Sequence, residues 1–84
     1  MNKLQKTYAI AKAAYETAFK AEAWDLVDKL EDPMLDAEFA LADWTFDTVV
    51  ATGKMSREDA DLIRSNSSLD QWAKIIDMGM RLQA

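Results

Sequence analysis

This sequence of 84 residues has a formal net charge of −5 and is 50% apolar, which is typical of one small globular domain. It contains no cysteine and no histidine, which excludes disulfides, thiolate metal sites and histidine-based catalysis. No apolar run reaches the roughly 18 residues of a membrane span and the first residues lack a signal-peptide core, so we expect no membrane association and a cytoplasmic location.

The charge is unevenly spread along the chain. Residues 1–21 carry four lysines and one acid, residues 22–47 carry nine carboxylates and one lysine, and residues 48–84 carry five acids and five bases. A field this negative repels nucleic acid and attracts basic protein surfaces. We therefore expect no direct binding of nucleic acid, and a protein partner with a basic surface, for which nucleic-acid-binding proteins are one class.

The first element in the chain is a predicted long helix over residues 3–31. Apolar residues recur along it at steps of three and four, and seven alanines add helix propensity. Its lysines lie toward the N-terminal end and its acids toward the C-terminal end, an order that opposes the helix dipole. This unfavourable order indicates that the charges serve an external purpose.

A second apolar stripe follows the other side of this predicted helix. In one interpretation Trp24 packs under another element of the same chain, because aromatic side chains are usually buried. In the other, the stripe is a homodimer surface on which small residues permit close approach and Trp24 is the anchor. The stripe consists of Ile10, Ala13, Thr17, Ala21 and Trp24.

The Asp32-Pro33 pair predicts a helical hairpin. Proline has no amide hydrogen to continue a helix, but it fits the first position of a new helix with Asp32 as the N-cap. The second helix is then predicted over residues 33–52. Phe39 and Phe46 share its main apolar stripe, and its broad apolar surface predicts a central helix.

Capping signals define the rest of the chain. Gly53 is expected to end the second helix in a left-handed conformation. Ser56 is the expected N-cap of a third helix, and Ser68 with Gln71 forms a capping box at the start of a fourth.

No stretch shows the period-two alternation of a strand. The sequence therefore predicts one all-α domain over residues 1–84, a small bundle of three main helices plus one short helix. The predicted helices cover residues 3–31, 33–52, 57–65 and 69–82.

Divalent metal binding is the one catalytic route that the residue types leave open. Glu22 and Asp25 stand three residues apart, which places both on one face of a helix, and carboxylate oxygens suit magnesium. Glu22-x-x-Asp25 resembles one fragment of the ExxE and ExxD pattern on which MazG-like all-α nucleotide pyrophosphohydrolases hold magnesium. The resemblance implies a magnesium-dependent hydrolase as a third hypothesis. No second pair stands in register, so we expect no enzyme, no metal and no cofactor.

The preferred hypothesis is a small protein-interaction module that uses the acidic hairpin. Regularly spaced carboxylates can substitute for nucleic-acid phosphates, so the module can act as an inhibitor or nucleic-acid mimic. In size and charge the chain is similar to phage-encoded inhibitors of host enzymes. The alternative is a self-associating structural domain whose acids only keep it soluble. The predicted partner-binding residues are Trp24, Asp25, Asp28, Glu31, Asp32, Asp36, Asp43, Trp44 and Asp47.

Overall fold

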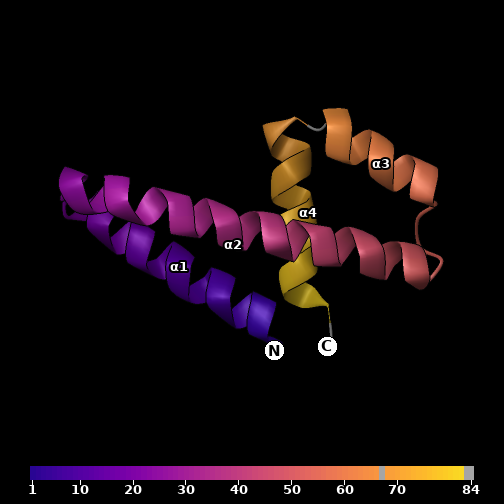
Figure 1. The fold of residues 1–84 in the computed structure, drawn as a ribbon, viewed down its shortest axis with the longest axis horizontal. Helices are drawn as coiled ribbons and strands as arrows, with labels where there is room; N and C mark the ends of the chain where they lie inside the picture. The colour runs from indigo at the N-terminus through magenta and orange to yellow at the C-terminus, as the bar shows by residue number, and fades with distance from the viewer. Residues whose placement is uncertain (67, 83–84) are drawn as a thin grey trace. The chain divides into compact units, whose positions relative to one another are not determined.

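The computed structural model describes residues 1–66 and 68–82 (Figure 1). These residues form four α-helices and no strand, which confirms the predicted all-α fold. The third and fourth helices agree with their predicted ranges to within one residue. The helices are α1 (Lys3–Lys20), α2 (Trp24–Ala51), α3 (Arg57–Asn66) and α4 (Leu69–Arg81).

The chain divides into two compact units, a first unit of Met1–Leu41 and a second unit that begins at Ala42. The first unit contains α1 and the N-terminal part of α2, and the second contains the rest of α2 together with α3 and α4. The single domain over residues 1–84 stays a prediction.

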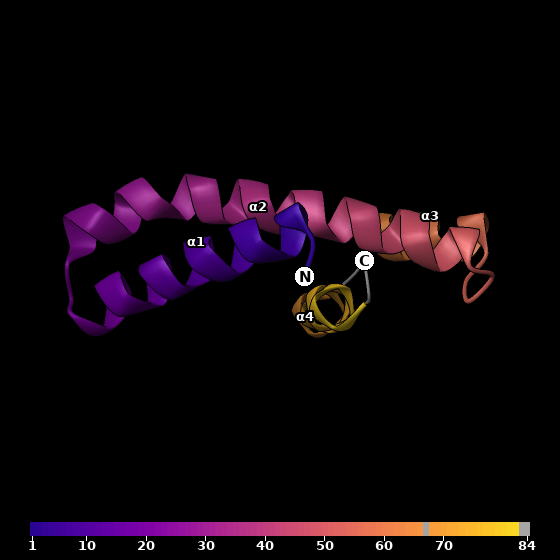
Figure 2. The same cartoon turned by 90° about the horizontal axis from the view of Figure 1, so that it is seen from below.

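The first hairpin turn lies at residues 21–23, and the prediction of a hairpin at Asp32-Pro33 is wrong. The first helix ends at Lys20 instead of residue 31, and α2 continues through Pro33 to Ala51 as one helix of 28 residues. The first helix is therefore short and the second is long. Figure 2 shows α1 running back along α2 from this turn.

Hydrogen bonds at the end of α1 form the turn. The Ala23 amide donates to the Ala18 carbonyl (3.0 Å) and the Glu22 amide donates to the Phe19 carbonyl (3.1 Å), which together make a Schellman motif. Glu22 takes the left-handed position of this motif, with a φ of 55°, where glycine is usual. The turn therefore has no glycine, which is the residue type that usually identifies a Schellman motif in a sequence.

The position of the turn accounts for the two charges that lie beside it. Lys20 lies in the last turn of α1 and Asp25 lies in the first turn of α2. Each charge complements the dipole of its own helix, a stabilisation of about 0.3–1 kcal/mol per charge. The break therefore makes the two charges beside it favourable, while Lys3 in the first turn of α1 still opposes the dipole of that helix.

Replacing Glu22 with glycine is expected to raise the free energy of unfolding by about 1 kcal/mol, because glycine adopts a positive φ without the steric cost of a β-carbon. Urea unfolding followed by far-UV circular dichroism measures the change. Glu22→Ala is the matched control, since alanine keeps the β-carbon and removes only the carboxylate. An equal gain with alanine would mean that charge, and not backbone conformation, limits the stability of the turn.

Pro33 lies inside α2, where it cannot donate to the carbonyl of Lys29. Its ring also disfavours the helical conformation at Asp32. The helix nevertheless continues because it buries residues on both sides of the proline, including Val27 (7% exposed) and Ala37 (8% exposed). Packing of the apolar side of α2 thus outweighs the local cost of the proline.

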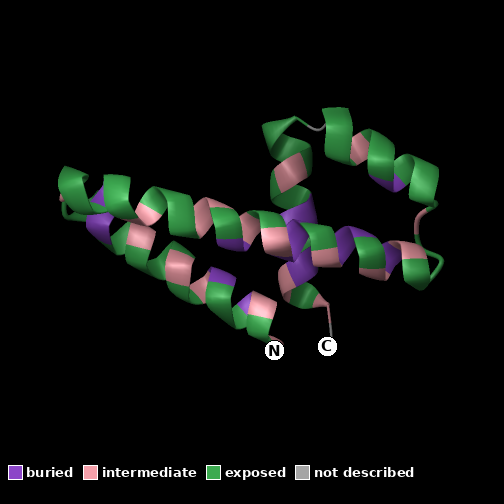
Figure 3. Cartoon of the chain, in the orientation of Figure 1, coloured by how far each residue is buried: buried purple, intermediate pink, exposed green. Residues whose placement is uncertain are grey.

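The core of the first unit is drawn from both of its helices. Tyr8 and Ala18 of α1 are buried, as are Val27 and Leu41 of α2 (Figure 3). Burial raises the pKa of the Tyr8 hydroxyl above its ordinary value, and the ammonium of Lys12, 5.8 Å from the ring centroid, acts in the opposite direction. This core is narrow, and much of the surface of both helices stays exposed.

The core of the second unit surrounds Phe46, whose side chain is 0% exposed. The guanidinium of Arg64 lies 5.0 Å from the centroid of its ring. All three helices of this unit contribute to the core. The other buried apolar residues are Ala42, Val49, Ala60, Ile75 and Ile76.

The helix ends in the second unit confirm the capping signals of the sequence. Gly53 has a φ of 75° and follows the end of α2. The hydroxyl of Ser56 accepts a hydrogen bond from the Asp59 amide (3.0 Å), and Ser68 forms a capping box with Gln71 at the start of α4.

Candidate functional site

The outer surface of α2 in the first unit combines acids with aromatic rings. Trp24, Asp28 and Glu31 follow one another at steps of four and three residues, and Asp32 lies four residues after Asp28, so all four project from one side of the helix. Phe39 follows Asp28 by eleven residues, which is about three helical turns and returns to that side. These five residues are named the acidic–aromatic face.

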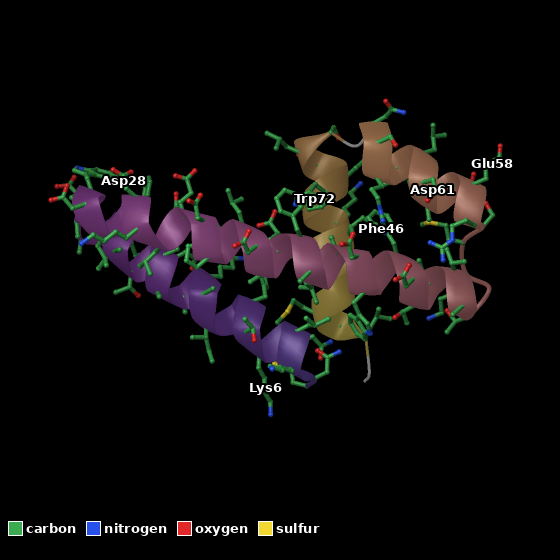
Figure 4. All side chains as sticks on the ribbon, viewed as in Figure 1. Lys6, Asp28, Phe46, Glu58, Asp61 and Trp72 are labelled. Carbon is green, nitrogen blue, oxygen red and sulfur yellow. The ribbon has the colours of Figure 1, made fainter. Side chains whose placement is uncertain are left out.

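The side chains of the acidic–aromatic face are accessible. Trp24 is 53% exposed and Phe39 is 55% exposed. The ring of Trp24 packs edge-on against Phe19 of α1, with 5.3 Å between the ring centroids, which holds it in place. Asp28, near the hairpin turn (Figure 4), is exposed like the other two carboxylates. None of the three acids forms an ion pair with another described residue.

This arrangement suits a partner that carries both basic and apolar groups. Carboxylates without a compensating base project their field into solvent and attract cationic side chains. A half-exposed ring that a neighbouring ring already holds loses little entropy when it enters an apolar pocket.

Six of the nine predicted partner-binding residues lie in the first unit and three in the second. Four of the six belong to the acidic–aromatic face. The other two, Asp25 and Asp36, are exposed on the same part of α2 and border that face. The structure therefore groups the six predicted residues of the first unit along one helix.

The three predicted residues of the second unit have different surroundings. The Asp43 carboxylate lies 3.4 Å from the Arg64 guanidinium, and the Asp47 carboxylate lies 3.2 Å from that of Arg57. Exposed ion pairs contribute only about 0–1 kcal/mol to stability, but they cancel the local charge. Trp44 is half-buried. These residues are less suited to attract a basic partner.

The magnesium hypothesis loses its geometric basis. Glu22 lies in the turn with a φ of 55° and Asp25 lies in α2, so the two residues are not on one helix face. Among the described residues, no group of three or more acidic side chains is arranged to hold a metal ion. The metal-dependent hydrolase stays a hypothesis.

Phe39 is the candidate residue that sequence reasoning missed. The sequence predicts it in the core beside Phe46, a prediction that is wrong because its side chain is 55% exposed. If a helix is predicted to begin at Pro33, the helical spacing between Phe39 and the residues before the proline is not considered. In one continuous helix, its spacing from Trp24 and Asp28 is the signal that would have found it.

A shallow apolar groove lies between α1 and α2 on the other side of the first unit. Leu26 stands two residues from both Trp24 and Asp28, about 200° around the helix, and beside the hairpin turn it also lines a shallow hollow together with Trp24. Small side chains line most of this groove, which is named the alanine groove. It is lined by Ala13, Ala14, Thr17, Ala18, Ala21, Ala23, Leu26 and Leu30.

The structure separates the residues of the predicted homodimer stripe. Ala13, Thr17 and Ala21 line the alanine groove, and Ile10 of α1 is 71% exposed. Trp24 instead packs against Phe19. The interpretation that Trp24 is covered by another element is wrong, since half of its side chain is exposed.

Comparison with known proteins gives no relative, because no protein-family model, curated protein or solved structure matches this chain. In the part of the chain that the structure describes, no helix has both the length and the apolar character that crossing a bilayer requires.

Proposed function

We propose that this chain is a protein-interaction module that binds a basic partner through the acidic–aromatic face. The observation that carries the proposal is the exposure of two aromatic rings, Trp24 and Phe39, among three carboxylates that lack ion-pair partners in the described chain. Isolated exposed apolar side chains are common on protein surfaces. Two large rings within one row of acids make a more specific arrangement.

The two kinds of side chain have separate roles in the proposed complex. Asp28, Glu31 and Asp32 attract the basic partner over a distance of about one Debye length, roughly 8–10 Å, and raise the rate of encounter. Trp24 and Phe39 then enter apolar pockets and slow dissociation, as buried aromatic anchors do in other interfaces.

Proteins that bind nucleic acid are one class of partner with such a surface. Their phosphate-binding grooves are basic and also present aromatic or apolar side chains. Occupation of such a groove by the acidic–aromatic face would exclude the nucleic acid, so the module would act as an inhibitor or mimic.

Reversal of two charges in the acidic–aromatic face, Asp28→Lys with Asp32→Lys, is expected to abolish partner binding. The measurement is affinity capture from a cell lysate with stepwise salt elution, quantified by mass spectrometry. The matched control is Glu58→Lys with Asp61→Lys in α3, because it makes the same change in net charge on exposed residues of the second unit. Wild type and the α3 variant should retain the same basic protein, which the α2 variant should lose.

Equal loss of the captured protein in both double variants would mean that net charge, and not the face, governs binding. Trp24→Ala provides a second test with no change in charge. It is expected to weaken binding of the captured protein by about 30-fold, the effect of removing an interfacial anchor worth roughly 2 kcal/mol. Wild-type affinity in this variant would contradict the proposed role of the ring.

A further inference from the structure

We propose that a hollow in the second unit binds a small organic phosphate, at a site that is separate from the acidic–aromatic face and independent of the function proposed for that face. The hollow is open to solvent and has a volume of about 410 Å³, a size within the range of roughly 300–1,000 Å³ that small-molecule sites occupy. It lies between the connection that follows α2 and the C-terminal part of α4. It is named the basic hollow, and it is lined by Lys54, Lys74, Asp77, Met78, Arg81 and Leu82.

Both lysines of the second unit line the basic hollow, although Lys54 and Lys74 belong to different elements. All three arginines of the chain pair with an aspartate, whereas neither of these lysines forms an ion pair with another described residue. The fold of the second unit therefore brings its two bases that lack an acidic partner to one hollow.

Helix dipoles account for only part of this arrangement. Lys54 follows the C-terminal end of α2, where a cation complements the dipole. Lys74 lies in the middle of α4 (Leu69–Arg81), where the dipole gives it no such role. Asp70 and Asp77 stand at helical spacing on either side of Lys74, but neither pairs with it, and Asp77 pairs with Arg81 instead (3.1 Å). The Lys74 ammonium is thus available to an anion.

The charge of the basic hollow favours a phosphate over a carboxylate. Because Asp77 and Arg81 pair with each other, the two lysine ammonium groups supply the net charge of the lining. A phosphate monoester carries between one and two negative charges at neutral pH and has three acceptor oxygens, so it can accept hydrogen bonds from both lysines. A carboxylate has a single charge to share between the two ammonium groups.

The basic hollow also has an apolar part. Met78, 38% exposed, and Leu82 line it beside the charged groups. The flexible thioether of methionine adapts to ligands of different shape. An organic group attached to the phosphate would cover this apolar surface, so an ester is expected to bind more tightly than inorganic phosphate.

Amide NMR spectra of the full chain, recorded during a titration with phenyl phosphate at constant ionic strength, test the site. We expect a dissociation constant on the order of 1 mM, which is reasonable for a small ligand in an open site. The largest shifts should occur at residues that line the basic hollow. Shifts that do not saturate, or that are no larger there than in the first unit, overturn the proposal.

Lys54→Gln and Lys74→Gln are each expected to raise the dissociation constant for phenyl phosphate about fivefold or more, because each removes one charge-assisted hydrogen bond. Lys29→Gln is the matched control, since it makes the same change in net charge at an exposed position of the first unit. It should bind phenyl phosphate like the wild type. Equal weakening in all three variants, or wild-type affinity in either variant of the basic hollow, overturns the proposal.

Two other compounds test the class of ligand. Benzoate has the same ring with one negative charge, and it is expected to bind at least about fivefold more weakly than phenyl phosphate. A short single-stranded oligonucleotide carries its phosphates as diesters along a polyanion, which the net charge of this chain repels. Equal affinity for benzoate, or displacement of phenyl phosphate by the oligonucleotide at a lower concentration of phosphate groups, overturns the assignment to a small organic phosphate.

Discussion

Phe46→Ala is expected to lower the free energy of unfolding by about 3–5 kcal/mol. The ring is 0% exposed at the centre of the second unit, so its removal leaves a cavity in a core too small to close around it. It also removes the surface on which the Arg64 guanidinium lies, 5.0 Å from the ring centroid. Urea unfolding followed by far-UV circular dichroism measures the loss.

Phe39→Ala is the matched control, because it deletes the same side chain seven residues earlier in the same helix. Its ring is 55% exposed, so we expect a loss of less than about 1 kcal/mol. If Phe39 serves the proposed interface, its variant should fold normally and bind the basic partner more weakly. A large loss of stability in the Phe39 variant would instead place this ring in the core, as its pattern in the sequence suggests.

Pro33→Ala is expected to raise the free energy of unfolding by about 2 kcal/mol. Alanine restores an amide that donates to the Lys29 carbonyl, and it removes the steric conflict of the ring inside the helix. Part of this gain is offset because an alanine chain has more freedom when unfolded. The measurement is again urea unfolding, with the helical signal of the native protein compared before and after the change.

The control for this prediction is Pro33→Gly. Glycine also restores the amide hydrogen, but its helix propensity is about 1 kcal/mol below that of alanine, so it should stabilise the protein less. The result also tests the topology of the chain. If Pro33 began a new helix after a hairpin at Asp32, neither substitution would stabilise the protein, and a loss in both variants would contradict one continuous α2.

The sequence was sufficient for the fold class and for the ends of helices that follow ordinary capping rules. Gly53, Ser56 and the Ser68–Gln71 pair occupy the positions for which these residue types are suited, and the structure uses each of them as predicted. The apolar period is helical throughout, so no strand competes with it.

Capping rules do not predict the position of the first hairpin, because two residues take positions that other residue types usually occupy. Proline normally ends a helix, yet Pro33 is inside one, and glycine normally takes a positive φ, yet Glu22 does so here. Local preference yields at both positions to the packing of α1 on α2. One signal in the sequence favours a break near Lys20, since Lys20 before the break and Asp25 after it each complement the dipole of their own helix.

The misplaced turn also determined which site residues could be found. The acids of residues 25–36 can be recognised from the sequence, because their density does not depend on where the helix begins. Phe39 shares a helix face with Trp24 only if one helix continues through Pro33. A predicted break at the proline therefore hides this shared face. The neutralisation of Asp43 and Asp47 depends on ion pairs with α3, which no pattern within α2 reveals.

The division of the chain into two units also divides its tryptophans. Trp24 lies in the first unit, whereas Trp44 and Trp72 lie in the second. Intrinsic fluorescence can therefore follow either unit without an added label, since Trp24→Phe leaves only the emission of the second unit, and the double change of Trp44 and Trp72 to phenylalanine leaves only that of the first. Tryptophan fluorescence can therefore show whether the two units unfold together or one after the other.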